Sequence, residues 1–130
     1  MKKLIILFAI TLALSPAYAQ QTSDVVVRVS VLVFSHLIDS LDDEVLVDLR
    51  TPDELKQGKI AGATVIDYFG TNFETAIQKL DRNKTYLLYC AGGSRSEDTA
   101  ELMRGLGFRK IYDLEPGFNG WVKKKMPIHK

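Results

Sequence analysis

Short apolar runs and more polar segments alternate along the chain, and this alternation predicts strands separated by helices. Runs rich in β-branched and other apolar residues, bounded by turn-forming residues, predict strands at 25–34, 45–49, 65–66, 85–89 and 111–114. The segments between and after them predict helices at 36–41, 52–57, 72–80, 97–106 and 118–124. Strands joined by helices rather than by tight hairpins pair in parallel. We therefore expect an α/β fold with three layers, in which a central, mostly parallel sheet of about five strands carries helices on both faces.

Polar residues mark where two of these helices begin. Ser35 is predicted to be the N-cap of the helix at 36–41. The run Thr51-Pro52-Asp53-Glu54 has the form of a capping box with proline at the first helical position, and Gly58 ends that helix. A short helix is therefore expected soon after the strand at 45–49.

The first residues have the layout of a cleavable secretory signal. Lys2 and Lys3 precede an apolar run at 4–14, and Ala17-Tyr18-Ala19 supplies small residues where a signal peptidase cuts. The apolar run is about half the ~20 residues that a membrane-spanning helix needs. We therefore expect residues 1–19 to be removed, and residues 20–130 to form one domain that is exported, into a periplasm.

Composition narrows the classes of function. The sequence has 130 residues, with 17 Lys and Arg, 16 Asp and Glu, and one Cys. This length fits one domain, and the balanced charge gives no reason to expect nucleic acid or a membrane as partner. One cysteine cannot form an internal disulfide or supply a metal cluster. We expect a monomer with no metal ion and no organic cofactor.

The single cysteine, Cys90, ends the strand at 85–89 and opens a glycine-rich loop before a helix. Gly92 and Gly93 allow successive backbone amides to turn inward, and the helix adds its free N-terminal amides. Arg95 adds a positive charge, and Ser94 and Ser96 add hydroxyl donors. These groups favour a thiolate, which is a nucleophile. The alternative is a structural cysteine buried as a small hydrophobe.

The spacing within the loop points to the kind of chemistry. Four residues separate Cys90 from Arg95, whereas cysteine phosphatases leave five to wrap a phosphate group. A shorter loop is expected to suit a single sulfur atom bound to the thiolate. A cysteine phosphatase or an arsenate reductase is the alternative that this spacing disfavours.

Three motifs in order resemble those of the rhodanese family of sulfurtransferases. The loop at 90–96, Cys-Ala-Gly-Gly-Ser-Arg-Ser, is similar to the family's active-site loop. The stretch at 47–63 resembles the family's first signature, and the stretch at 107–128, with Trp121, resembles its closing one. The resemblance as a whole covers about residues 31–128. Lys59 and Pro116 depart from the residues that are usual at their positions.

The resemblance implies a rhodanese-like fold and a sulfurtransferase. It implies that Cys90 takes a sulfane sulfur from a donor such as thiosulfate and passes it to cyanide or a thiol, which a protein can carry. The groups implied to bind substrate are those of Ala91, Gly92, Gly93, Ser94, Arg95 and Ser96. Asp48 and Arg50 are implied to support the loop from behind. The alternative is a persulfide carrier or redox-interaction module for a protein partner, with little turnover of small molecules.

Overall fold

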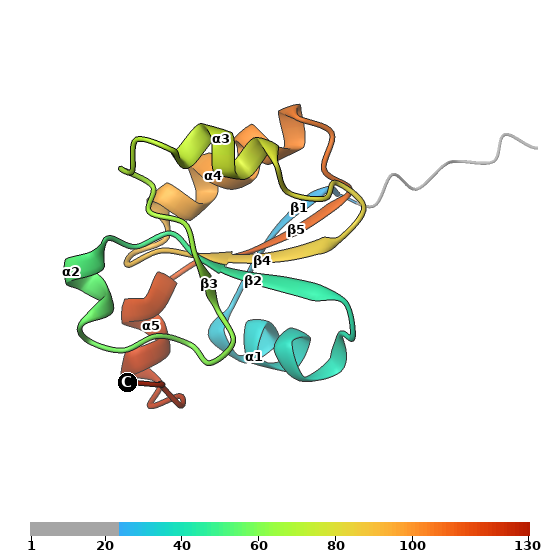
Figure 1. The fold of residues 1–130 in the computed structure, drawn as a ribbon. Coiled ribbons are helices and arrows are strands. Elements are labelled where there is room, and N and C mark those ends of the chain that lie inside the picture. Colours follow the sequence, from blue (N-terminus) through green and yellow to red (C-terminus); the bar gives the residue numbers. More distant parts are fainter. Residues whose placement is uncertain (1–23) are drawn as a thin grey trace, which may run out of the picture.

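The structure is a computed structural model, and it describes residues 24–130 (Figure 1). The predicted signal at residues 1–19 lies outside this range. Within the described range, the helices are too short or too polar to cross a membrane.

Five strands and five helices alternate along the described chain. The strands are β1 (Val26–Val29), β2 (Glu44–Asp48), β3 (Thr64–Val65), β4 (Thr85–Tyr89) and β5 (Lys110–Leu114). The helices are α1 (Val31–Ser40), α2 (Pro52–Leu55), α3 (Phe73–Gln78), α4 (Ser94–Gly105) and α5 (Gly117–Lys123). All neighbouring strands pair in parallel, in the order β1-β5-β4-β2-β3. The expected sheet of about five strands is confirmed, and it is parallel throughout.

The sheet separates two apolar clusters, one under each layer of helices. Helices α1 and α5 cover one face, and α3 and α4 cover the other (Figure 1). On the first face, the Phe34 ring meets the rings of Tyr89 and Trp121 edge-on, each at 6.4 Å between centroids. On the second face, Leu88 and Met103 are fully buried in the other cluster. The three-layer prediction is therefore confirmed.

The first helix begins earlier than the sequence pattern suggested. The predicted strand at 25–34 ends at Val29, and α1 starts at Val31. Ser30, not Ser35, is the N-cap, because its hydroxyl accepts a hydrogen bond from the amide of Val33. The β-branched run after Ser30 looks like a strand. It forms a helix because this places Phe34 in the core, and tertiary packing outweighs a weak local propensity.

The capping box predicted at the start of α2 is present. The Thr51 hydroxyl accepts from the Glu54 amide at 3.4 Å, and a Glu54 carboxylate oxygen accepts from the Thr51 amide at 2.8 Å. The helix ends at Leu55, before Gly58, whose φ is +98°. Glu54 is thereby held at a fixed position next to the carboxyl end of β2.

Candidate active site

Cys90 lies directly after β4, the central strand, at the carboxyl edge where parallel α/β sheets bind ligands. Its side chain is fully buried. The sulfur accepts a hydrogen bond from the Gly93 amide at 3.1 Å and lies 3.5 Å from the Ser96 hydroxyl. Cys90 also belongs to the apolar cluster under α4. The thiol is therefore both packed like a core residue and hydrogen-bonded like a site residue.

The loop after Cys90 is held by the start of α5. The carbonyl of Cys90 accepts from the amide of Phe118 at 2.8 Å, and that of Ala91 accepts from Asn119 at 3.0 Å. Within one planar trans peptide the N–H points away from the C=O, so a carbonyl bonded to α5 leaves the N–H of the same peptide facing the opposite way. Helix α5 therefore fixes the orientation of the peptides that begin the loop around the sulfur.

Helix α4 begins at Ser94, three residues before the predicted start at 97. Gly93 precedes it with φ +101°, a left-handed conformation that lets the chain enter the helix at once. Ser94, Arg95 and Ser96 therefore form the first turn of the helix instead of a longer loop. The sequence did not reveal this early start, because the turn depends on the backbone angle of one glycine.

The predicted loop residues differ in how near they come to the sulfur. Gly92 and Ser94 are exposed, and Ala91 is half-buried. Gly93 and Ser96 are buried, and these two place a polar group next to the thiol. The structure therefore brings Gly93 and Ser96 together with Cys90, while Gly92 and Ser94 face solvent.

Arg95 is held by a carboxylate that sequence reasoning had not placed in the site. Its guanidinium donates two hydrogen bonds to Glu54, at 2.9 and 2.6 Å, and lies 5.5 Å from the centroid of the Phe69 ring. Two parallel bonds of this kind are the strong form of an Arg–carboxylate pair. The sequence marked Glu54 only as a capping residue. Its second role depends on a contact across 41 positions of the chain.

The ion pair with Arg95 gives Glu54 a marked effect on acid stability. The hydrogen bond from Arg95 holds the pKa of Glu54 at about 2, against an opposing effect of burial. A lowered pKa stabilises the fold above the ordinary Glu value of about 4.3, and that stabilisation is lost as pH falls toward 2. Glu54→Gln, which keeps the capping box, is expected to lower the free energy of unfolding at pH 7 by about 1–2 kcal/mol.

Urea unfolding between pH 2.5 and pH 7 tests this expectation. The difference between wild type and Glu54→Gln should shrink steadily as the pH falls below about 4.5. Asp53→Asn in the same helix is the matched control, because its ion pair with Lys56 is exposed on both sides. A gap between wild type and Glu54→Gln that stays constant over this range would contradict the assignment.

Asp48 and Arg50 form a buried ion pair behind the loop. The Arg50 guanidinium lies 2.7 Å from Asp48 and donates to the carbonyl of Gly58 at 2.8 Å. It also stacks on the Phe118 ring, 3.7 Å from its centroid. Arg50 thus connects β2 and the segment after α2 to α5, the helix that holds the Cys90 loop. The Asp48–Arg50 pair therefore contacts α5, the helix that holds the Cys90 loop in place.

Asp113, on β5, is a second carboxyl group that the sequence did not indicate. Its side chain is fully buried, and one oxygen accepts from Arg28 at 2.9 Å. The other oxygen, Oδ1, has no hydrogen-bond partner among the described residues. Burial raises the pKa of Asp113, while the nearby Ser96 hydroxyl and the Arg28 guanidinium oppose the rise. An acidic residue inside an apolar strand was the one available signal.

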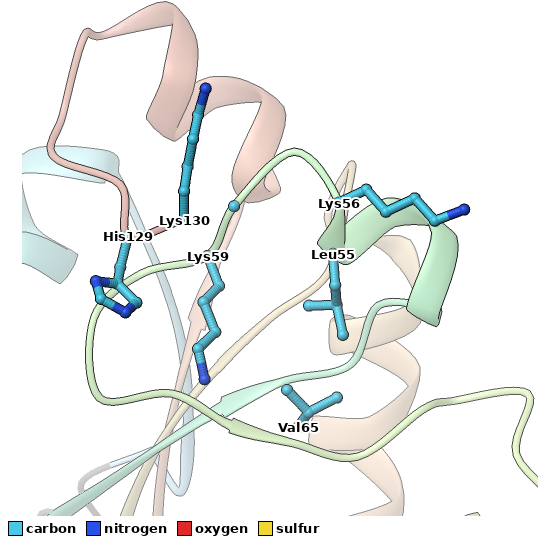
Figure 2. Close-up of a pocket in the computed structure, with 7 residues that line it drawn as sticks. Leu55, Lys56, Lys59, Val65, His129 and Lys130 are labelled. Atoms are coloured by element: carbon cyan, nitrogen blue, oxygen red, sulfur yellow. The ribbon is translucent and has the colours of Figure 1, made fainter.

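A separate pocket of about 480 Å³ lies beside the end of α2 (Figure 2). Leu55 and Val65 supply apolar contacts, and Lys56, Lys59 and Lys130 supply charge. Figure 2 shows the side chains of Lys56 and Lys130 pointing in different directions. Lys56 is paired with Asp53, and the Lys59 ammonium donates to the carbonyl of Ala63. These cations do not converge, so we assign no ligand here.

The fold and the Cys90 loop define a rhodanese-like protein. The sequence model of the Rhodanese-like domain family matches residues 34–124, and the chain belongs to that family. It is 28% identical over 87 residues to thiosulfate sulfurtransferase GlpE of Glaesserella parasuis, covering 67% of this chain and 79% of the relative. It is 25% identical over 107 residues to the putative sulfur carrier protein YrkF of Bacillus subtilis, covering 82% of this chain and 57% of the relative.

Solved structures agree with this assignment. A rhodanese-related protein from Thermoplasma volcanium superposes with a TM-score of 0.69 and 27% identity, over 78% of this chain and 96% of that chain. The family resemblance predicted from the three motifs is confirmed. Membership of this family supports sulfur transfer as the general activity, and leaves the donor and the acceptor open.

Proposed function

We propose that the protein transfers a sulfane sulfur from a donor such as thiosulfate to cyanide or a thiol through a persulfide on Cys90. The observation that carries the proposal is the Gly93 amide, which points at a buried sulfur from a loop of fixed orientation. Such a donor stabilises negative charge on the thiolate and on a sulfur bound to it. A cysteine held in this way is suited to covalent catalysis.

The two half-reactions need no group beyond donor, acceptor and Cys90. In the first, the Cys90 thiolate attacks the sulfane sulfur of thiosulfate, a new S–S bond forms, and sulfite leaves with the electron pair of the old bond. In the second, cyanide attacks the outer sulfur, thiocyanate leaves, and the pair returns to Cys90. Because Cys90 is fully buried, neighbouring side chains must move before a donor reaches it.

Intact mass spectrometry tests the first half-reaction directly. The protein is mixed with excess thiosulfate, separated from it, and weighed before and after treatment with cyanide. We expect a gain of one sulfur atom, which cyanide removes, and no gain in Cys90→Ala. Wild-type protein that gains nothing, or a gain that persists in Cys90→Ala, would contradict the proposal.

A second candidate function is a persulfide carrier for a protein partner. Two observations favour it: Glu54 neutralises the charge of Arg95, and Phe69 next to Arg95 is 69% exposed. A neutralised arginine attracts a small anionic donor weakly, whereas an exposed aromatic ring suits a protein contact. Steady-state turnover of thiosulfate and cyanide separates the two. A kcat in the ordinary range of about 1–1,000 per second favours the enzyme, and full persulfide loading with slower turnover favours the carrier.

We also propose that the protein acts outside the cytosol after removal of residues 1–19. The pattern of Lys2, Lys3, the apolar run and Ala19 supports this. N-terminal sequencing of protein from fractionated cells tests it, with Gln20 as the expected first residue. Full-length protein found only in the cytosolic fraction would contradict it.

A further inference from the structure

We propose that Glu54 is a specificity-determining residue that acts through Arg95, so that the site favours a sulfur donor with one negative charge and an organic group over a doubly charged inorganic donor. The inference rests on the proposed sulfur transfer through Cys90, and it names the class of donor for that transfer. Thiosulfate represents the inorganic class, and an organic thiosulfonate represents the singly charged class.

The strand order brings Glu54 and Arg95 to the same edge of the sheet. Strand β2 is a neighbour of β4, and α2 follows β2 as the Cys90 loop follows β4. Because the strands are parallel, both connections leave from the carboxyl edge. Arg95 lies in the first turn of α4, next to Ser96, whose hydroxyl is 3.5 Å from the sulfur. Glu54 therefore controls the charge that this turn presents.

Glu54 occupies the outer edge of the Arg95 guanidinium. The Nη1 atom donates to one carboxylate oxygen at 2.9 Å, and Nη2 donates to the other at 2.6 Å. This is the two-bond geometry with which an arginine binds a carboxylate or another oxyanion. A thiosulfate ion that binds the same edge must first displace Glu54.

The capping box keeps Glu54 from moving aside. The oxygen that pairs with Nη1 of Arg95 also accepts from the Thr51 amide at 2.8 Å and from the Thr51 hydroxyl at 3.0 Å. The hydrogen bond from Arg95 holds the pKa of Glu54 at about 2, so the carboxylate is charged at neutral pH. The Glu54–Arg95 pair is therefore a fixed unit with no net charge.

The Phe69 ring adds an apolar surface beside this pair. Its centroid lies 5.5 Å from the guanidinium carbon of Arg95, and the residue is 69% exposed. A doubly charged ion loses hydration when it enters such a site and gains no net attraction from a neutral pair. An organic group can instead pack on the exposed ring. The pair and the ring together favour a singly charged organic donor.

The transfer step balances for this class of donor. The Cys90 thiolate attacks the outer sulfur of an organic thiosulfonate, a new S–S bond forms, and the bond between the two sulfur atoms of the donor breaks. A sulfinate leaves with the electron pair of that bond. The charge of thiolate and donor together equals that of persulfide and sulfinate, and no proton moves.

The rate of sulfur loading from two donors tests the inference. Persulfide on Cys90 is measured by intact mass in rapidly quenched mixtures with thiosulfate or benzenethiosulfonate, and the rate is divided by the donor concentration. Glu54→Gln keeps the capping box and leaves Arg95 with its charge. It should load about tenfold faster from thiosulfate and about threefold faster from benzenethiosulfonate, because the freed charge acts on two charges or on one. A slower rate, or an equal change with both donors, would overturn the inference.

Asp53→Asn is the matched control, because it removes the same charge from the exposed side of the same helix. Its loading from both donors should stay within about twofold of wild type. The gain in Glu54→Gln should also shrink as KCl rises from about 20 to about 500 mM, since salt screens the freed charge. An equal gain in Asp53→Asn, or a gain that salt does not reduce, would overturn the inference.

Phe69→Ala tests the contact with the organic group. The variant should slow loading from benzenethiosulfonate about threefold more than loading from thiosulfate, because only the first donor carries an aromatic ring. Phe69 is exposed, so its loss leaves no cavity in the core. An equal effect on both donors would overturn the assignment of an organic donor.

A measurement on wild-type protein covers the case in which Glu54→Gln does not fold. Because Glu54 neutralises Arg95, loading from thiosulfate should not fall by more than about twofold between about 20 and about 300 mM KCl. A larger fall would show a free cation that attracts the doubly charged ion, and would overturn the inference. Wild-type protein that loads from neither donor would instead count against the proposed sulfur transfer itself.

Discussion

Cys90→Ala is expected to lower sulfur transfer by about a thousandfold or more, because the variant has no atom on which a persulfide forms. The same change is expected to cost about 1 kcal/mol of stability. That cost arises because the sulfur is fully buried in the cluster under α4 and accepts a hydrogen bond from the Gly93 amide. Steady-state transfer from thiosulfate to cyanide measures the first effect, and urea unfolding measures the second.

Cys90→Ser is the matched control for this variant. A serine oxygen keeps an acceptor for the Gly93 amide but is a far weaker nucleophile toward sulfur. It should therefore abolish transfer to the same extent with a smaller loss of stability. If Cys90→Ala instead unfolds the protein and Cys90→Ser retains transfer, Cys90 is a structural residue and the proposed mechanism is wrong.

Gly93→Ala is expected to remove both persulfide formation and about 2–4 kcal/mol of stability. Gly93 has φ +101°, where any side chain is strained. A methyl group there would come 2.0 Å from the carbonyl oxygen of Glu115, which belongs to the backbone and cannot rotate away. Relief of this clash must move the loop, and with it the amide that faces the sulfur. Urea unfolding and intact mass after thiosulfate treatment measure the two losses.

Gly92→Ala, one position earlier, is the control that separates loop composition from loop geometry. A methyl group on Gly92 meets no atom within 4 Å. The variant should therefore stay within about 0.5 kcal/mol of wild type and load sulfur normally. If both alanine variants lose stability and sulfur loading, or if both keep them, the role given to the backbone of Gly93 is contradicted.

Most of the fold was predictable because strand and helix signals were strong where the core is deepest. The strand at 85–89 was predicted with its observed bounds, since an apolar run between turn residues leaves little choice. The predicted start of α1 was wrong because Val31 and its neighbours favour a strand locally. Only packing against Tyr89 and Trp121, distant in sequence, makes the segment a helix.

The candidate site was predictable only where its residues are adjacent in the sequence. The loop at 90–96 could be read from one motif, and the structure brings its Gly93 and Ser96 to the sulfur. Glu54 and Asp113 come from other elements. Glu54 pairs with Arg95, and Asp113 binds Arg28, which donates to the carbonyl of Gly93 at 3.4 Å. No spacing rule predicts these contacts, because they depend on strand order and on the early start of α4.

The attachment of the Cys90 loop to α5 has a consequence for biosynthesis. The peptides that orient the loop are anchored by Phe118 and Asn119, which the ribosome adds well after the cysteine. A nascent chain that ends before these residues has the thiol but not its anchored surroundings. Under the proposed mechanism, the cysteine therefore becomes competent for sulfur transfer only after α5 has been synthesised and has docked against the loop.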